Sequence, residues 1–460
     1  MRMQCKISFV LLLLIMFLVS TIGQAEEKEQ ASLWPVPDYM GSIWTRPALT
    51  GNWGGVRTKM ADKGITVSVD IIQTYQNIID GGREFGDVIG TRLGNAIINS
   101  TDLGIGRPKG TGGEFGGSVD YEIHFDFNKM GLMPGAFLRI FGETKFGDFI
   151  DSNTGALTAV NTDSLFPTIK DERTTLTGFV YYQFLSEWFA LYLGKLDTLD
   201  GDANAFAGAR GKDQFMNQNF VFNPVTLATV PYSALGGGAL FVLPNNRGLF
   251  SFTALDPNGT AKKIGFDDAF DGGVVLTSEL RIGVKPFGFQ GHQLLGATWN
   301  SRDFTGLDQD FSRLFFEFLT TGAATLDEKE DSWSLYYNFD QYLYVEDEKT
   351  NQGVGIFGRF GWADKDTNPI ENFYSVDVGG KGIIPGRDND TFGIGYWYID
   401  PSDKFPNPFN IIHRGKGAEI FYNFEITPWM HITPDFQIID PGLRAVETNY
   451  IAGIRVKISL

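Results

Sequence analysis

The sequence predicts an all-β fold, a transmembrane antiparallel up-and-down β-barrel of about 16 strands with a short N-terminal helix and long extracellular loops. Three observations predict it. The chain starts with a leader typical of exported proteins. Segments of strand length alternate between polar and apolar residues. No later segment approaches the roughly 18 consecutive apolar residues of a membrane helix.

Residues 1–25 are predicted to be a signal peptide. Arg2 and Lys6 precede an apolar run over residues 7–19, and Gly23 and Ala25 are small residues at the positions that a signal peptidase reads. A membrane anchor is the alternative, but the run is too short to span a bilayer as a helix. A lipoprotein is disfavoured because Cys5 lies before the run. Export of a membrane barrel predicts the outer membrane of a Gram-negative cell.

Removal of this leader changes the charge and the thiol content. The formal net charge of the whole chain is −17. Loss of Arg2 and Lys6, with no carboxylate lost, makes it −19. The single cysteine, Cys5, is also lost, so disulfides are not expected. The strong negative charge argues against nucleic-acid binding, which needs basic patches.

Residues 26–64 are predicted to form a periplasmic lead-in. Three prolines mark irregular backbone, and residues 56–63 are expected to be a short helix followed by Gly64. Residues 65–460 are expected to form the barrel, without a second globular domain.

Alternation is clearest at residues 118–127 and 136–146. In the first segment, Asp120, Glu122, His124 and Asp126 share one face and apolar residues share the other. A packed core would not accept four titratable groups without partners. The second segment places Arg139, Glu143 and Lys145 on one face in the same way. Such strands have one wet and one apolar face.

The same alternation recurs at 278–285, 332–340, 417–426, 430–438 and 449–460. The polar faces of these segments supply the candidate pore-lining residues, except Arg359, which is added as a further candidate. These candidates are Asp120, Glu122, His124, Asp126, Arg139, Glu143, Lys145, Glu279, Arg281, Lys285, Arg359, Glu419, Asp435 and Arg455.

A soluble β-sandwich also alternates, so two further features matter. The alternating segments are about ten residues long, which matches a tilted bilayer crossing. Aromatic residues cluster at the ends of the apolar faces, as interfacial girdles require. Examples are Trp188-Phe189, Trp397-Tyr398 and Trp429. Between the strands, loops are expected at 80–117, 147–175, 200–236, 303–331 and 400–416.

Signals of catalysis are weak. His124, His292, His413 and His431 are scattered without metal-ligand spacing. No nucleophile elbow is present, and Gly104-Ile105-Gly106 lacks the third glycine of a dinucleotide loop. We therefore expect no enzyme activity, no catalytic residue, no metal and no cofactor. His124 is the best candidate for a barrel-wall enzyme, although a lumen-lining role is the simpler interpretation.

Several segments, in the same order along the chain, resemble the carbohydrate-selective porin family, the OprB-type porins. Near the N-terminus the resemblance rests on Leu49–Arg57, and in the middle on Gly194–Asp197 and Phe215–Asn217. It is closest in the C-terminal third, over Gly355–Gly361, Gly382–Asp390, Glu419–Tyr422, Ile426–Trp429, Pro434–Gln437 and Gly453–Arg455. It covers roughly residues 45–460. Two departures are Leu460, where the family has a terminal aromatic residue, and Asn52, where it has Asp.

The resemblance implies passive diffusion of small carbohydrates, mono- and disaccharides such as glucose. The mixed-charge wet face is compatible with this, since rings of charged residues set what a pore passes. It implies contact with outer-membrane lipid, lipopolysaccharide and the barrel-assembly machinery, with no nucleic-acid partner. A monomer and a homotrimer both remain open. The alternatives are a general non-selective porin, a barrel enzyme and a structural barrel with a plugged lumen.

Overall fold

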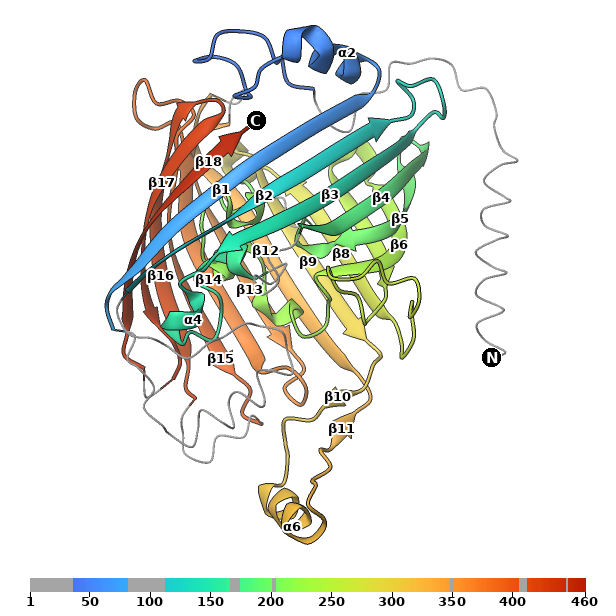
Figure 1. The fold of residues 1–460 in the computed structure, drawn as a ribbon, viewed down its shortest axis with the longest axis vertical. Coiled ribbons are helices and arrows are strands. Elements are labelled where there is room, and N and C mark those ends of the chain that lie inside the picture. Colours follow the sequence, from blue (N-terminus) through green and yellow to red (C-terminus); the bar gives the residue numbers. More distant parts are fainter. Residues whose placement is uncertain are drawn as a thin grey trace. The chain divides into compact units, whose positions relative to one another are not determined.

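The computed structural model describes residues 36–81, 112–165, 174–200, 204–347, 351–404, 412–443 and 446–460. Within them, sixteen antiparallel strands close a barrel by pairing β1 with β18 (Figure 1). This confirms the predicted fold class. The expected signal peptide lies outside the described residues. In the part of the chain that the structure describes, no helix is long and apolar enough to cross a membrane.

The barrel strands are β1 (Ile65–Asp80), β2 (Gly112–Asp126), β3 (Ala136–Gly147), β4 (Thr174–Ser186), β5 (Phe189–Asp197), β6 (Ser233–Val242), β7 (Gly248–Leu255), β8 (Val275–Val284), β9 (Gly291–Asn300), β12 (Ser332–Asp347), β13 (Gln352–Ala363), β14 (Ile370–Lys381), β15 (Thr391–Pro401), β16 (Gly415–Thr427), β17 (Met430–Asp440) and β18 (Asn449–Ser459). A separate pair is formed by β10 (Phe304–Thr305) and β11 (Glu328–Lys329). The α-helices are α2 (Val56–Asp62), α4 (Asp151–Thr154), α5 (Gln218–Val221) and α6 (Phe311–Thr321). Short 3₁₀ turns are η1 (Trp53–Gly55), η2 (Thr162–Ser164), η4 (Thr198–Asp200), η5 (Ala209–Gly211), η6 (Pro224–Thr226), η7 (Pro244–Asn246) and η8 (Pro286–Gly288).

The outer face of the barrel exposes apolar side chains. Leu193, Leu295, Val376, Ile394 and Ile420 are each at least half exposed. They come from five strands, and Tyr121 of β2, Leu176 of β4 and Ile454 of β18 are exposed on the rest of the wall, so together these side chains form a band rather than one patch. A band of this kind suits lipid contact, since in a membrane barrel every second residue faces outward.

The two ends of the barrel differ in their connections. At the end near α2, strands are joined by short turns, of two residues at 187–188 and 428–429. Long loops lie at the other end: L2 (148–173), L3 (198–232), L4 (256–274) and L5 (301–331). Figure 1 shows α6 of L5 at this end, away from the strands. Short turns at one end and long loops at the other are the usual asymmetry of membrane barrels.

The expected loop over 80–117 is wrong at its C-terminal end, because β2 starts at Gly112. The six residues Gly112–Gly117 pair with β1 residues Ile78–Gln73. Glycine is needed here for close approach: a Cβ at Gly117 would lie 2.2 Å from the carbonyl oxygen of Ile72 and 2.6 Å from the Phe146 ring. Gly117 therefore serves the close packing of strands rather than a loop.

The predicted N-terminal helix is confirmed within one residue as α2, which is followed by Lys63 and by Gly64 at φ +84°. Arg57 of α2 is buried and joins the two strands at the barrel seam. Its guanidinium donates to the carbonyl oxygens of Val67 (2.8 Å), just inside β1, and Leu460 (3.0 Å), just after β18. It also lies 4.0 Å from the centre of the Tyr39 ring.

Candidate functional site

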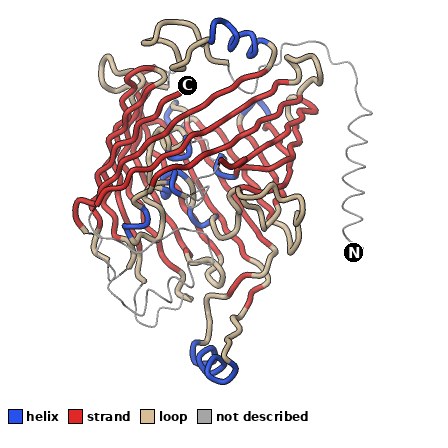
Figure 2. The backbone as a smooth tube through the Cα atoms, in the orientation of Figure 1, coloured by secondary structure: helices blue, strands red, loops and turns tan. Residues whose placement is uncertain are grey.

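The lumen is narrowed by L2 and L3, which fold into the barrel. Figure 2 shows short helices of these loops inside the ring of strands. Their apolar side chains are largely buried, and Phe215 of L3 packs against Phe357 of β13 and Phe421 of β16 at ring distances of 5.6 and 4.7 Å. L3 therefore leaves the wall after β5, crosses the lumen and reaches the far wall.

Charged side chains of the far wall bind the backbone of L3. Glu419 accepts hydrogen bonds from the amides of Met216 (2.6 Å) and Asn217 (2.9 Å). Arg455 donates to the carbonyls of Gly211 (2.6 Å) and Gln214 (2.9 Å). The bonds from the Arg455 guanidinium are charge-assisted and belong to the stronger class.

Arg359 acts on L3 in the same way. It donates to the carbonyl oxygens of Ala207 and Val221 at 3.1 Å each, and also to that of Phe220. Its side chain has no exposed surface. The far wall thus holds L3 in place. Its side chains form hydrogen bonds with peptide groups of L3 that are not paired in the β-sheet.

A buried cluster of charges joins both loops to β2 and β3. Lys212 of L3 lies 2.7 Å from Asp120 of β2, 2.8 Å from Glu143 of β3 and 3.2 Å from Asp163 of L2. Lys145 contacts Glu143 and Asp163 from the other side. Because these contacts link four chain segments, they fix the position of L2 and L3 relative to the wall.

The cluster shifts the titration of its loop residues. Burial favours a higher pKa for Asp163, but Lys145 and Lys212 hold its pKa well below the ordinary value. Burial favours a lower pKa for Lys212, but Asp163, Glu143 and Asp120 raise its pKa above the ordinary value. Both groups are therefore charged at neutral pH.

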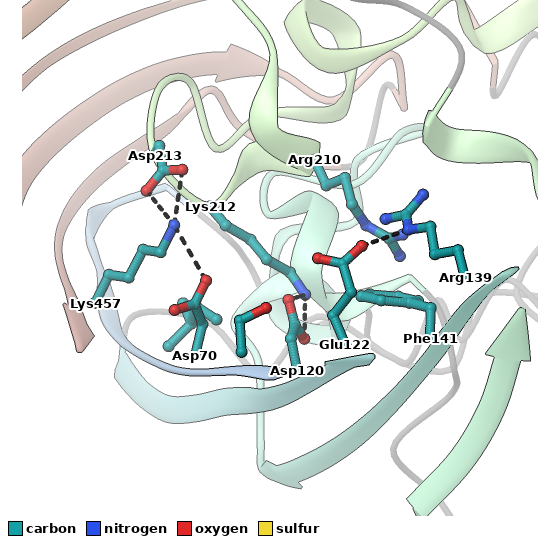
Figure 3. Close-up of a pocket in the computed structure, with 11 residues that line it drawn as sticks. Asp70, Asp120, Glu122, Arg139, Phe141, Arg210, Lys212, Asp213 and Lys457 are labelled. Atoms are coloured by element: carbon teal, nitrogen blue, oxygen red, sulfur yellow. Dashed lines mark hydrogen bonds and ion pairs between the residues drawn. The ribbon is translucent and has the colours of Figure 1, made fainter. Parts of the chain in front are cut away.

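A cavity of about 160 Å³ remains beside this cluster (Figure 3). Four carboxylates and four cations line it, together with Ser68, Ile72 and Phe141. The charged residues are Asp70, Asp120, Glu122, Asp213, Arg139, Arg210, Lys212 and Lys457. The formal charges of the lining cancel.

Most charged lining residues form ion pairs with one another at the two sides of the cavity. At one side, Lys457 lies 2.8 Å from Asp213 and 3.5 Å from Asp70. At the other, Arg139 contacts Glu122, and the guanidinium of Arg210 lies 4.5 Å from the centre of the Phe141 ring. Burial favours a higher pKa for Asp213, but Lys457 keeps its pKa below the ordinary value. The cavity thus presents fixed donors, fixed acceptors and one aromatic ring.

The structure separates the predicted pore-lining residues into groups. Asp120, Glu122 and Arg139 line the cavity. Glu143 and Lys145 are buried in the cluster behind it. His124 lies beside Glu122, with its Nε2 3.0 Å from the carboxylate.

The other candidates lie away from the cavity. Arg359, Glu419 and Arg455 lie under L3, and Asp435, beside them on β17, accepts from Gln437 (3.0 Å). Glu279 accepts from the Tyr336 hydroxyl (2.6 Å), and Arg281 is 3.9 Å from Asp340. Asp126 accepts from the Lys129 amide in the β2–β3 turn, and Lys285 follows the end of β8. These positions indicate different tasks for residues that share one pattern.

The sequence-based candidates did not include five charged residues of the cavity. Asp70 and Lys457 lie on wet faces of β1 and β18. The alternation over 449–460 already places Lys457 on the polar face, and the alternation of β1 could have revealed Asp70. Arg210, Lys212 and Asp213 come from L3, where no periodic signal exists. Among the described residues, no group of three or more His, Cys, Asp or Glu side chains could hold a metal ion.

The chain matches a family model, a related porin sequence and several solved structures. A family model described as carbohydrate-selective porin, OprB family, matches residues 111–460. Porin B of Pseudomonas aeruginosa is 24% identical over 127 residues, which span 23% of this chain and only 28% of that porin.

Two solved structures of Pseudomonas putida OprB share the fold. The high-pH structure has a TM-score of 0.73 at 18% identity and covers 91% of this chain and 100% of its own. The low-pH structure has a TM-score of 0.55 at 14% identity and covers 91% and 99%.

Proposed function

Since the chain belongs to the carbohydrate-selective porin, OprB family, we propose that it is an outer-membrane porin for passive diffusion of small carbohydrates, mono- and disaccharides such as glucose. The observation that carries the proposal is the cavity between L3 and strands β2 and β3, whose lining has equal numbers of positive and negative groups. Family and fold indicate a channel rather than an enzyme.

The chemistry of the cavity suits a neutral polyhydroxyl permeant. A sugar that leaves water must replace hydrogen bonds to its hydroxyl groups, because unpaired polar groups are costly. Glu122 and Asp70 can accept such bonds, while Arg139 and Lys457 can donate them. The lining carries equal numbers of positive and negative groups, so it offers neutral solutes many partners without favouring either sign of ion.

The Phe141 ring adds an apolar contact. The ring lies at one edge of the cavity, near two arginines. The guanidinium carbons of Arg139 and Arg210 are 5.4 and 4.5 Å from the ring centre. The ring is only 5% exposed, so it can offer a small apolar contact to the C–H face of a pyranose while the charged groups bind its hydroxyls. This arrangement supports carbohydrate preference over simple sieving.

The setting of the channel is part of the proposal. Residues 1–25 are the signal peptide, 26–64 the periplasmic lead-in and 65–460 the barrel. The protein resides in the outer membrane of a Gram-negative bacterium, inserted by the barrel-assembly machinery and surrounded by lipid and lipopolysaccharide. It functions without catalytic residue, metal or cofactor, as a monomer or a homotrimer.

Swelling of liposomes that contain the purified protein tests the function. We expect swelling in glucose and maltose and none in a large oligosaccharide. A general non-selective porin would pass amino acids and small ions of the same size equally fast. Absence of swelling in every small sugar would contradict the proposal and favour a plugged structural barrel.

A further inference from the structure

Three segments at the α2 end of the barrel fold outward over lipid-facing side chains. They are the β2–β3 turn (127–135), the β14–β15 turn (382–390) and residues 36–48 before α2. We propose that together they form an interfacial collar that lies in the headgroup region of the inner leaflet of the outer membrane. The inference concerns the barrel's membrane contact and is independent of what the channel conducts.

The β2–β3 turn rests on an outward-facing tyrosine. Tyr181 of β4 pairs with Leu138 on the outer face. Its hydroxyl donates to the Gln183 side-chain oxygen at 2.7 Å and lies 3.1 Å from the Met133 sulfur. The neighbouring Gln183 side chain donates to the carbonyl of Pro134 at 3.0 Å. The turn is thereby held against the outside of the wall, and Leu132 at its tip is 67% exposed.

The β14–β15 turn is braced on the outer face of β16. Asp390 accepts from the hydroxyl of the outward-facing Tyr422 at 2.9 Å. Arg387 makes two hydrogen bonds to Asp390 (2.7 and 2.8 Å) and lies 5.6 Å from the centre of the Phe424 ring. This bracing leaves Ile383 and Ile384 exposed at the tip of the turn.

The segment before α2 adds a third apolar group. The indole nitrogen of Trp429, in the β16–β17 turn, donates to the carbonyl of Ile43 at 2.6 Å. Met40, Ile43 and Trp44 are exposed, Trp44 to 70%. The segment thus meets the wall at an aromatic residue of the periplasmic rim.

Lipid is the occupant that these contacts favour. Each segment touches a Tyr, Phe or Trp of the rim, so its exposed apolar side chains continue the lipid-facing surface of the barrel. Aromatic residues gather at the membrane–water boundary, where one end of the side chain is apolar and the other is wet. Exposed apolar groups so close to that boundary gain by entering it. Lys129, exposed in the first turn, suits lipid phosphates.

Spin-label accessibility tests the collar in the full-length protein. The probes are Leu132→Cys and Ile384→Cys, each in a Cys5→Ser background, labelled with a nitroxide and reconstituted in vesicles of phosphatidylethanolamine and phosphatidylglycerol. Arg247→Cys in the β6–β7 turn (243–247) is the matched control, because that turn has polar exposed residues. Collision with apolar oxygen and with a water-soluble nickel chelate is measured for each label.

The collar predicts that labels at 132 and 384 collide more with oxygen than with nickel, whereas the label at 247 shows the opposite order. Nickel collision at 132 and 384 as high as at 247 overturns the proposal, because the turns then face water. Low collision with both reagents also overturns it, since the turns are then covered by protein, as in an oligomer.

Discussion

Two walls of the lumen carry the same kinds of inward-facing charged residues in different surroundings. On β2 and β3, Glu122 and Arg139 keep 25% and 22% of their side chains exposed and line the cavity. On β13 and β18, Arg359 and Arg455 are at most 1% exposed, because L3 covers them. The comparison teaches that alternation decides which way a charge points, whereas the loop against it decides what the charge does.

The largest effect is expected at the buried charge cluster that joins L2 and L3 to β2 and β3. Lys212→Met removes the cation that lies between Asp120, Glu143 and Asp163. Breaking a buried ion cluster from one side costs about 3–5 kcal/mol, because the remaining carboxylates stay buried without their partner. We expect earlier unfolding in urea and faster chymotrypsin cleavage at phenylalanines of L2 and L3, such as Phe149 and Phe215.

Lys263→Met is the matched control for this prediction. Lys263 pairs with Asp268 at 3.0 Å, but its side chain is 65% exposed. Pairs of this kind contribute about 0–1 kcal/mol. Equal unfolding of the two variants would show that the cluster does not hold the loops.

A second, smaller effect is expected where L3 covers the wall at β13, and it should be absent at β3, which lines the cavity. Arg359→Met removes donors to three L3 carbonyls, and we expect a loss of roughly 2–3 kcal/mol, as for hydrogen bonds to charged groups. L3 should loosen, so single-channel current should become larger and noisier. Arg139→Met on the open wall should leave trypsin cleavage of L3 unchanged; faster cleavage in that variant would remove the distinction between the walls.

The docking of L2 should depend on pH through Asp151. Burial raises the pKa of Asp151 to about 6, against about 3.9 in an unfolded chain. The folded state therefore binds more protons at this group, so its contribution to stability is full below about pH 4 and is lost as pH rises through about 6. Asp163, whose pKa is lowered, changes stability only below that window.

Asp151→Asn provides the comparison. Asparagine keeps an acceptor for the Val160 amide, which lies 2.6 Å from the Asp151 carboxylate, but does not titrate. Trypsin protection of L2 between pH 4 and 7 should fall with pH in the natural protein and fall less in the variant. The same slope in both proteins would assign the dependence to other groups.

The smallest effect on stability, but a clear effect on permeation, is expected at the cavity. Arg139→Gln removes a charged donor from the lining, and loss of about 0.5–1 kcal/mol of hydrogen bonding corresponds to roughly 2–5-fold slower glucose entry into liposomes. Lys285→Gln, in the turn after β8, should not change the rate. Slowing by both variants to the same extent would mean that the cavity has no special role.

The sequence contained most of the information about the wall. Alternation in segments such as 118–127 assigned Asp120 and Glu122 to the wet face, and the family resemblance agreed with the barrel. The predicted helix over 56–63 was correct within one residue. These features succeed because they depend on neighbours in the chain, on a period of two residues and on turn chemistry.

The interior of the lumen could not be predicted in the same way. The contact between Lys212 and Glu143 joins residues from a non-periodic loop and a distant strand, and nothing local encodes it. Arg359 and Arg139 both point into the lumen from their strands, and nothing in the sequence around either one reveals that L3 covers the first and not the second. Likewise, the sequence could not reveal that residues 112–117 belong to β2, because the close contacts of Gly117 with Ile72 and Phe146 exist only in the closed sheet.

The seam between β1 and β18 has a kinetic consequence for assembly. Tyr75 and Ile454 pair across it although they are about 380 residues apart, whereas β4 and β5 are joined by a turn of two residues. Loop-closure entropy grows by about 0.6 kcal/mol per doubling of length, so this pairing starts about 4–5 kcal/mol behind a hairpin. High contact order of this kind slows folding. The hairpins are therefore expected to form first, and Arg57, which bonds to both sides of the seam, stabilises a closure that no turn assists.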